Sequence, residues 1–83
     1  MSKYIYAVTI QKTDNGKLFA EALRIPTSRN LASVVKATIG LQTLNIMPSK
    51  AKAIETARAW EDTFIENGTS YFDRNYVTSC FDL

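Results

Sequence analysis

The sequence predicts an α+β domain of order ββαβα, with a three-stranded, mostly antiparallel sheet and two helices on one of its faces. Two alternating, strand-like segments flank Asn15-Gly16, and a long amphipathic helical pattern runs over residues 50–66. Proline and glycine residues separate the remaining segments. No repeat or linker divides the chain, so we expect residues 1–83 to form a single domain.

Residues 3–12 and 18–25 are rich in strand formers, and Asn15-Gly16 suits a two-residue type I′ hairpin turn. Such a turn pairs Ile10 with Glu21, Val8 with Leu23 and Tyr6 with Ile25, which makes one face of the hairpin nearly all apolar. Glu21 would then need a partner on that face, such as Lys12. The reverse face would carry small and polar side chains, namely Ala7, Thr9, Gln11, Ala20, Ala22 and Arg24.

A short helix is expected after Pro26, capped by Ser28 or Asn30 and closed by Gly40. Its apolar residues follow helical spacing: Leu31, Val34, Val35 and Ile39. From Leu41 to Met47 the apolar period returns to two, which predicts a third strand that Pro48 ends.

Lys50 to Glu66 forms the strongest helical pattern, closed by Asn67-Gly68. One face of this helix carries Ala53, Ile54, Ala57, Trp60 and Phe64. We therefore expect Trp60 to be a core anchor, and Glu61 beside it to lie at the rim or to pair with Arg24. The last residues, with Tyr71-Phe72 and then Tyr76 to Phe81, could add a fourth, edge strand or form an arm.

The simplest topology places the first strand between the other two and antiparallel to both, with a crossover through the short helix. Both helices would cover the apolar face and leave the other face open. That open face is the candidate binding surface, and its polar residues are Thr9, Gln11, Arg24, Thr43 and Asn45.

Composition argues against catalysis and against a metal or other cofactor. The chain has no histidine and a single cysteine, Cys80, which excludes an intramolecular disulfide and the usual catalytic triads and zinc sites. No apolar run approaches the roughly eighteen residues of a membrane span, and no signal-peptide core precedes the first strand pattern. We therefore expect a cytoplasmic, non-enzymatic protein without membrane contact, whose thin core favours a homodimer.

Several short strings are similar to small uncharacterised proteins of phages and other mobile elements of Gram-positive gut bacteria. They are Arg24-Ile25-Pro26, Asn45-Ile46 before Pro48-Ser49-Lys50, the pair Ala57 and Trp60, and Asn67-Gly68-Thr69 with Tyr71-Phe72. Residues 44–68 also resemble, more weakly, the arm-site DNA-binding domains of phage integrases. The first resemblance implies a mobile-element protein, and the second implies DNA binding by a sheet.

The leading expectation is thus a non-catalytic binding or adaptor protein of a mobile element, self-associating through its open sheet face or C-terminal arm. One alternative is a nucleic-acid-binding domain that lays the sheet on DNA; its phosphate contacts would be Lys17, Arg24, Arg29 and Lys36, although the net charge is only +2. Another alternative is a phage inhibitor whose protein partner is a host enzyme.

Overall fold

The computed structural model describes residues 3–83 and confirms the α+β class. Its elements are β1 (Tyr4–Lys12), β2 (Leu18–Pro26), α1 (Leu31–Ala37), β3 (Leu41–Met47), α2 (Lys50–Glu66) and β4 (Phe81–Asp82). The strand order is β3-β1-β2-β4; β1 is antiparallel to β2 and β3, and β4 is parallel to β2. The expected central position of the first strand is confirmed, and the C-terminal segment does add a short edge strand.

The hairpin loop between β1 and β2 is one residue longer than predicted. The Thr13 N–H donates to the Lys17 carbonyl at 2.8 Å, and the Lys17 N–H donates back to Thr13 Oγ1 at 3.1 Å. These bonds enclose a three-residue loop in which only Gly16 has a positive φ, whereas a type I′ turn needs two such residues. The predicted type I′ turn is therefore wrong, because the Thr13 hydroxyl stabilises the longer loop.

One extra loop residue shifts the register of the hairpin by one. Val8 lies opposite Ala22 rather than Leu23, and Leu23 lies opposite Ala7. Because side chains alternate along a strand, this shift moves Leu23 and Ile25 to the other face of the sheet. Both faces of the sheet therefore carry apolar residues that need to be covered.

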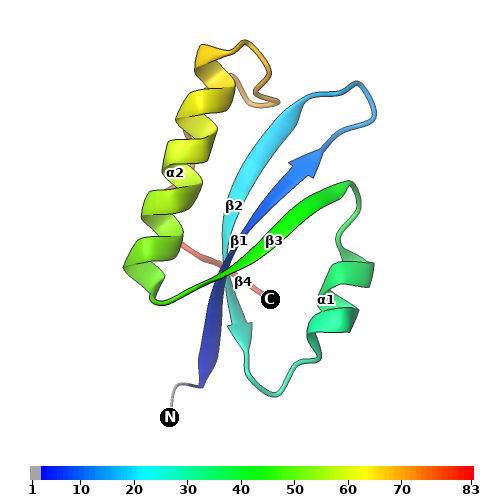
Figure 1. Ribbon diagram of the computed structural model, residues 1–83, viewed down its shortest axis with the longest axis vertical. Helices are drawn as coiled ribbons and strands as arrows, with labels where there is room; N and C mark the ends of the chain where they lie inside the picture. The colour runs from blue at the N-terminus through cyan, green and yellow to red at the C-terminus, as the bar shows by residue number, and fades with distance from the viewer. Residues whose placement is uncertain (1–2) are drawn as a thin grey trace.

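The two helices lie on opposite faces of the sheet, not on one (Figure 1). On one face, α2 packs through residues such as Ala57 and Phe64 against Val8 and Ala22. On the other, Val34 of α1 packs in a smaller cluster of buried residues, with Ala7, Leu23 and Ile25. The prediction that both helices share one face is wrong because the register shift puts Leu23 and Ile25 on the face opposite to Val8, so each face needs its own helix.

The short helix α1 ends earlier than its apolar spacing predicts. Asn30 is its N-cap, accepting from the Ala32 N–H at 2.8 Å, and Thr38 rather than Gly40 is its C-cap. Gly40, with φ +75°, instead allows close approach to β1: the Lys12 N–H donates to the Gly40 carbonyl at 2.8 Å. A Cβ on Gly40 would lie 2.2 Å from the Lys12 carbonyl oxygen, so this contact requires glycine.

The long helix α2 has the predicted bounds, but its buried face is rotated from the predicted one. Ser49 caps its start by accepting from the Lys52 N–H at 3.1 Å. Its buried residues are Ala53, Ala57, Glu61 and Phe64. Trp60 is 44% exposed and contacts Phe64 with ring centroids 5.8 Å apart, so the prediction that Trp60 anchors the core is wrong. Small alanines let the helix lie close to the sheet, which leaves the large indole at the flank.

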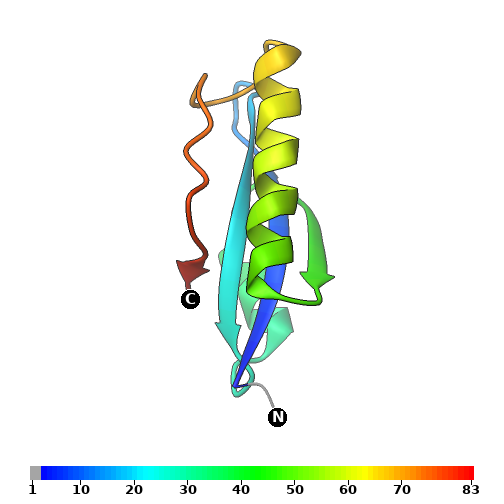
Figure 2. The ribbon, with the colours of Figure 1, turned by 90° about the vertical axis from the view of Figure 1, so that its left-hand side faces the viewer.

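The segment 69–83, called the C-terminal arm below, runs along the outer edge of β2 (Figure 2). It bridges to β2 at Ser70 with Leu18 and again where Phe81 of β4 lies opposite Leu23. Between these two points the rings of Phe72 and Tyr76 are in contact, with their centroids 4.4 Å apart. The arm thus extends the sheet at that edge without forming a long strand.

Candidate functional site

The five residues predicted to form one binding face do not lie together. Thr9 and Gln11 project on the α1 side of the sheet and are buried, while Arg24, Thr43 and Asn45 project on the α2 side. The split follows from the register shift in the hairpin. The single open polar face that the sequence predicted does not exist in this fold.

Thr9 and Gln11 belong to a small buried network. The Gln11 amide donates to Thr9 Oγ1 at 3.3 Å and to Glu21 Oε1 at 2.5 Å. Gln11 is therefore the hydrogen-bond partner of the Glu21 carboxylate, whereas the sequence had suggested Lys12 as that partner. These polar groups hold β1 and β2 together rather than facing a partner.

Arg24 is engaged within the chain. Its Nε lies 2.6 Å from Asp82 Oδ1, and its guanidinium carbon lies 4.5 Å from the centroid of the Tyr4 ring. The hydrogen bond to Asp82 is the main cause that raises the pKa of Arg24 above its ordinary value. Arg24 thus ties the end of the C-terminal arm to β2.

The other basic residues proposed for phosphate contact are dispersed. Lys17 lies at the hairpin loop, where its Nζ donates to the Gly68 carbonyl at 3.1 Å. Arg29 follows the opposite end of β2, a strand of nine residues that spans about 30 Å. Lys17 therefore lies at the other end of the sheet from Arg29, so these cations do not form one compact surface.

Side chains from α2 and from the C-terminal arm close the outer edge of β2. The Ala20 N–H donates to Glu61 Oε1 at 3.1 Å, and the Ser70 hydroxyl donates to Glu61 Oε2 at 2.5 Å. The Tyr76 hydroxyl donates to the Ala20 carbonyl at 2.5 Å as well. Glu61 is fully buried, so the expectation of a rim position or a pairing with Arg24 is wrong. The carboxylate substitutes for a neighbouring strand at Ala20.

Further contacts fix the C-terminal arm to α2. The Arg58 guanidinium donates to the Val77 carbonyl, and the Asn75 amide donates to the Arg58 carbonyl at 2.9 Å and to Asp62 Oδ1 at 2.7 Å. With the β4 pairing, these bonds leave little of the outer edge of β2 open to another chain. The protein protects this edge of its sheet with its own residues.

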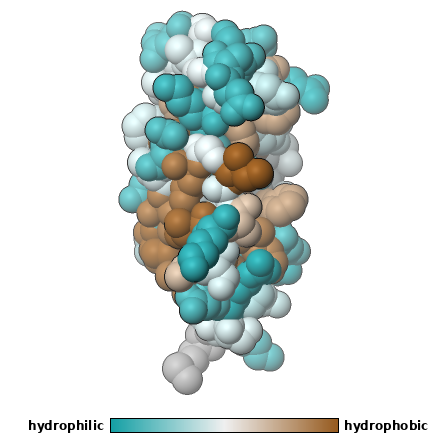
Figure 3. Space-filling model, turned by 90° about the vertical axis from the view of Figure 1, so that its right-hand side faces the viewer, coloured by the Kyte–Doolittle hydropathy of each residue, from teal (hydrophilic) through white to brown (hydrophobic). Residues whose placement is uncertain are grey.

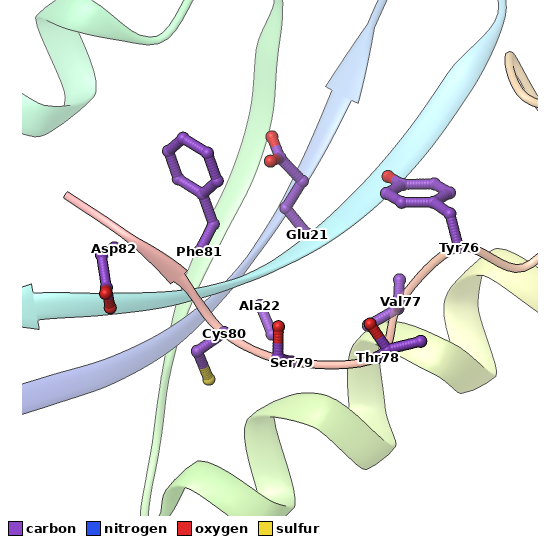
Figure 4. Close-up of a pocket in the computed structure, with 9 residues that line it drawn as sticks. All are labelled: Glu21, Ala22, Tyr76, Val77, Thr78, Ser79, Cys80, Phe81 and Asp82. Atoms are coloured by element: carbon purple, nitrogen blue, oxygen red, sulfur yellow. The ribbon is translucent and has the colours of Figure 1, made fainter.

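A cavity of about 290 Å³ lies between β2 and the C-terminal arm (Figure 4). Its polar groups are largely occupied within the chain, since Glu21 accepts from Gln11 and Tyr76 donates to the Ala20 carbonyl. Cys80 points to the side away from Glu21 and Phe81 (Figure 4), and burial raises the pKa of its thiol. The cavity therefore offers few free groups for recognising a ligand and no activated nucleophile.

The opposite edge of the sheet is formed by β3, which pairs with β1 on its inner side and has no strand on its outer side among residues 3–83. Figure 2 shows β3 at the right-hand margin, with the C-terminal arm on the other side of the sheet. Backbone groups alternate in direction along a strand. In β2, the backbone groups of Leu18, Ala20 and Arg24 form hydrogen bonds on the outer side, so the residues between them bond to β1. Following the same alternation through β1 to β3, the N–H and C=O groups of Leu44 and Ile46 point outward.

This edge is uncharged and partly apolar, and further exposed apolar residues lie on the α1 side of the molecule. β3 reads Leu-Gln-Thr-Leu-Asn-Ile-Met and carries no charged residue. Ile46 is 52% exposed, and two more exposed apolar residues, Val35 and Ile39, lie on or just after α1. Figure 3 shows apolar side chains gathered across the middle of the α1 side of the molecule. Leu44, Ile46 and the outward backbone of β3 are called the β3 edge site below.

The sequence contained a signal for this site that pattern reading did not use. A seven-residue strand without charge or internal proline is unusual at an edge, where charges normally block pairing. The predicted topology already placed the second and third strands on either side of the first, but the sequence could not reveal that Glu61 and the arm would cover only the outer edge of β2. That distinction depends on contacts between residues far apart in the chain.

The chain matches no protein-family model, no curated protein and no solved structure. Within residues 3–83, no helix is long and apolar enough to cross a membrane.

Proposed function

We propose that this chain is a non-catalytic binding protein that works through protein contact, and that its contact surface is the β3 edge site. The observation that carries the proposal is the contrast between the two edges of one sheet. The outer edge of β2 is closed by a buried carboxylate and by the C-terminal arm, whereas the outer side of β3 meets no strand of residues 3–83 and β3 carries no charge.

An uncovered strand edge is a template for pairing with another chain. Outward N–H and C=O groups at Leu44 and Ile46 would provide main-chain hydrogen bonds to an added strand. The exposed side chain of Ile46 would provide apolar contact. This combination of backbone and apolar contacts suits a protein strand better than a nucleic acid, which would require cations that β3 lacks.

The proposal locates contact at a sheet edge instead of the open sheet face expected from the sequence. It keeps the expected class, a small binding or adaptor protein, and it accommodates an inhibitor that adds a strand to a larger enzyme. The proposed setting in a mobile element depends on the sequence resemblance alone.

A capture experiment with two matched variants tests the proposal. Ile46→Lys puts a charge on the free edge, and Phe81→Lys replaces another half-exposed apolar residue, 58% exposed, on the same sheet face but at the other edge. We expect the immobilised wild-type protein and Phe81→Lys to retain the same protein from a cell lysate, and Ile46→Lys to lose it. Hydrogen exchange should show the Leu44 and Ile46 amides becoming protected in the captured complex.

Equal retention by Ile46→Lys, or a complex in which these two amides still exchange freely, would place the contact elsewhere and refute the proposal. Circular dichroism of both variants provides the control for folding.

A further inference from the structure

We propose that the strand added at the β3 edge site comes from a second copy of this chain, in a symmetric antiparallel β3–β3 pair. This inference rests on the proposed function, because it names the partner of the same edge. It specifies the register, the symmetry and the residue on the twofold axis.

The number of free edges favours a closed dimer. A sheet with two free edges can continue to add copies and form a fibre, whereas a sheet with one free edge can pair, among copies of the same chain, only with that same edge. The C-terminal arm and Glu61 cover β2, so β3 meets β3. Two identical edges that meet in this way form an isologous, twofold interface, and the dimer then has no edge of this kind left.

The composition of β3 permits two copies to approach. The strand has no charged residue, so no like charges meet when two copies pair. Lys50 is the first charged residue after it, and Pro48 lies between them. Charges and internal prolines are two of the features that keep a sheet edge from pairing, and residues 41–47 have neither.

The irregularity of the β1–β3 ladder selects the register. The ladder shifts between Ile10 and Gln11, which leaves Gln42 as the extra residue and confines regular pairing to residues 43–47. The centre of that regular stretch is Asn45. A twofold axis at Asn45 pairs Leu44 with Ile46 of the other copy, and their outward backbone groups can then form hydrogen bonds in both directions.

The same register matches side chains on both faces of the joined sheets. On the α1 side, Leu44 and Ile46 of each copy form one apolar group, which would cover the exposed part of Ile46. On the α2 side, the two Asn45 side chains meet at the axis, where each amide can donate to the other.

Helix α2 leaves room for this arrangement. α2 packs chiefly over β2 and β1, so about four strand spacings of about 4.8 Å separate it from its copy. That separation of about 19 Å exceeds the roughly 10–12 Å diameter of a helix with its side chains. The shallow space between the two copies of α2 would be flanked by Trp60, which lies on the side of α2 away from the C-terminal arm.

Engineered disulfides test the register directly. In a Cys80→Ala background, Asn45→Cys would place two thiols at a non-hydrogen-bonded pair, where Cα atoms lie about 4.5 Å apart, within the range of a disulfide. Thr43→Cys is the matched control, because it lies on the same strand and face. Its two copies would be four residues out of register, about 13 Å apart and beyond the reach of a disulfide.

Under mild oxidation we expect Asn45→Cys to form a covalent dimer at least about tenfold faster than Thr43→Cys. Sedimentation velocity of the wild-type protein should show a concentration-dependent dimer, which Ile46→Lys weakens by about tenfold or more and Phe81→Lys leaves intact. Cross-linking of Thr43→Cys as fast as Asn45→Cys would overturn the inferred register.

A wild-type protein that remains monomeric up to about 1 mM would overturn the inference of a second copy. The proposed function would still stand if a different protein were captured with the Leu44 and Ile46 amides protected. Both ideas would fail together only if those amides stayed unprotected in every complex.

Discussion

Replacing Glu61 with alanine should destabilise the protein more than any change on the exposed face of α2. The fully buried carboxylate accepts the Ala20 N–H at 3.1 Å and the Ser70 hydroxyl at 2.5 Å, and so links α2, β2 and the C-terminal arm. Glu61→Ala removes both acceptors and leaves a gap beneath the arm. A buried donor without a partner costs about 1–3 kcal/mol.

The expected net loss for Glu61→Ala is about 2–4 kcal/mol. The upper part of that range corresponds to two buried donors, the Ala20 N–H and the Ser70 hydroxyl, that both lose their acceptor. The lower part is expected because the variant no longer has to bury a charged carboxylate, which offsets some of the loss. The Ser70 hydroxyl can also rotate, and its oxygen already accepts the Asp73 N–H at 3.1 Å. A chain of 83 residues has a total stability of about 4–12 kcal/mol, so the loss would be a large part of it.

Urea unfolding followed by far-UV circular dichroism measures this loss, with two comparison variants. Glu61→Gln keeps a carbonyl oxygen for the Ala20 N–H and an amide that can donate to the Ser70 oxygen, so it should cost only about 1 kcal/mol. Glu55→Ala on the same helix breaks an exposed 3.6 Å ion pair with Lys52, so its effect should stay within about 0.5 kcal/mol.

Hydrogen exchange adds a local readout, because the Ala20 amide should lose protection in Glu61→Ala and retain it in Glu61→Gln. If Glu61→Ala unfolded at the same urea concentration as Glu55→Ala, the carboxylate would not be the link between α2 and the outer edge of β2.

Three further measurements check other parts of the fold. Gly40→Ala should cost more than about 2 kcal/mol in urea unfolding because its Cβ would meet backbone at 2.2 Å, whereas Gly68→Ala, with open space, should cost only about 1 kcal/mol; equal losses would refute the close-approach argument. Trp60→Ala should cost less than about 1.5 kcal/mol and Phe64→Ala about 3–5 kcal/mol, since Trp60 is half exposed and Phe64 is buried; the reverse order would mean that the indole is packed. Because burial raises the pKa of the Cys80 thiol, less thiolate is present near pH 8 than in a free cysteine, so alkylation by iodoacetamide should be slower than for a free cysteine and should accelerate as the pH rises; a rate equal to that of free cysteine would contradict the packing of Cys80.

Local signals in the sequence located the elements well. Helix α2 runs from Lys50 to Glu66 and β3 from Leu41 to Met47 as predicted, because capping residues and glycine or proline act within a few residues of the positions they define. The crossover helix was predicted too long, since Val35 and Ile39 continue an apolar spacing that the backbone does not follow beyond Ala37. Exposed apolar residues and core residues look alike in a sequence.

The candidate site could not be predicted from the pattern of apolar and polar residues alone. The Thr13 hydroxyl selected a three-residue loop, and one added residue moved Leu23 and Ile25 across the sheet. That single step separated Thr9 and Gln11 from Arg24, Thr43 and Asn45, because side-chain direction in a strand has a period of two.

The amino-acid sequence by itself determined the α+β class, the order of the elements and the place of the first strand at the centre of the sheet. Short-range preferences and alternation are sufficient for those features. Only the tertiary structure decided which helix covers which face, that Glu61 closes one edge of the sheet, and that β3 remains free at the other. These outcomes depend on register and on contacts such as Glu61 with Ala20, 41 residues away, whose energies no local pattern contains.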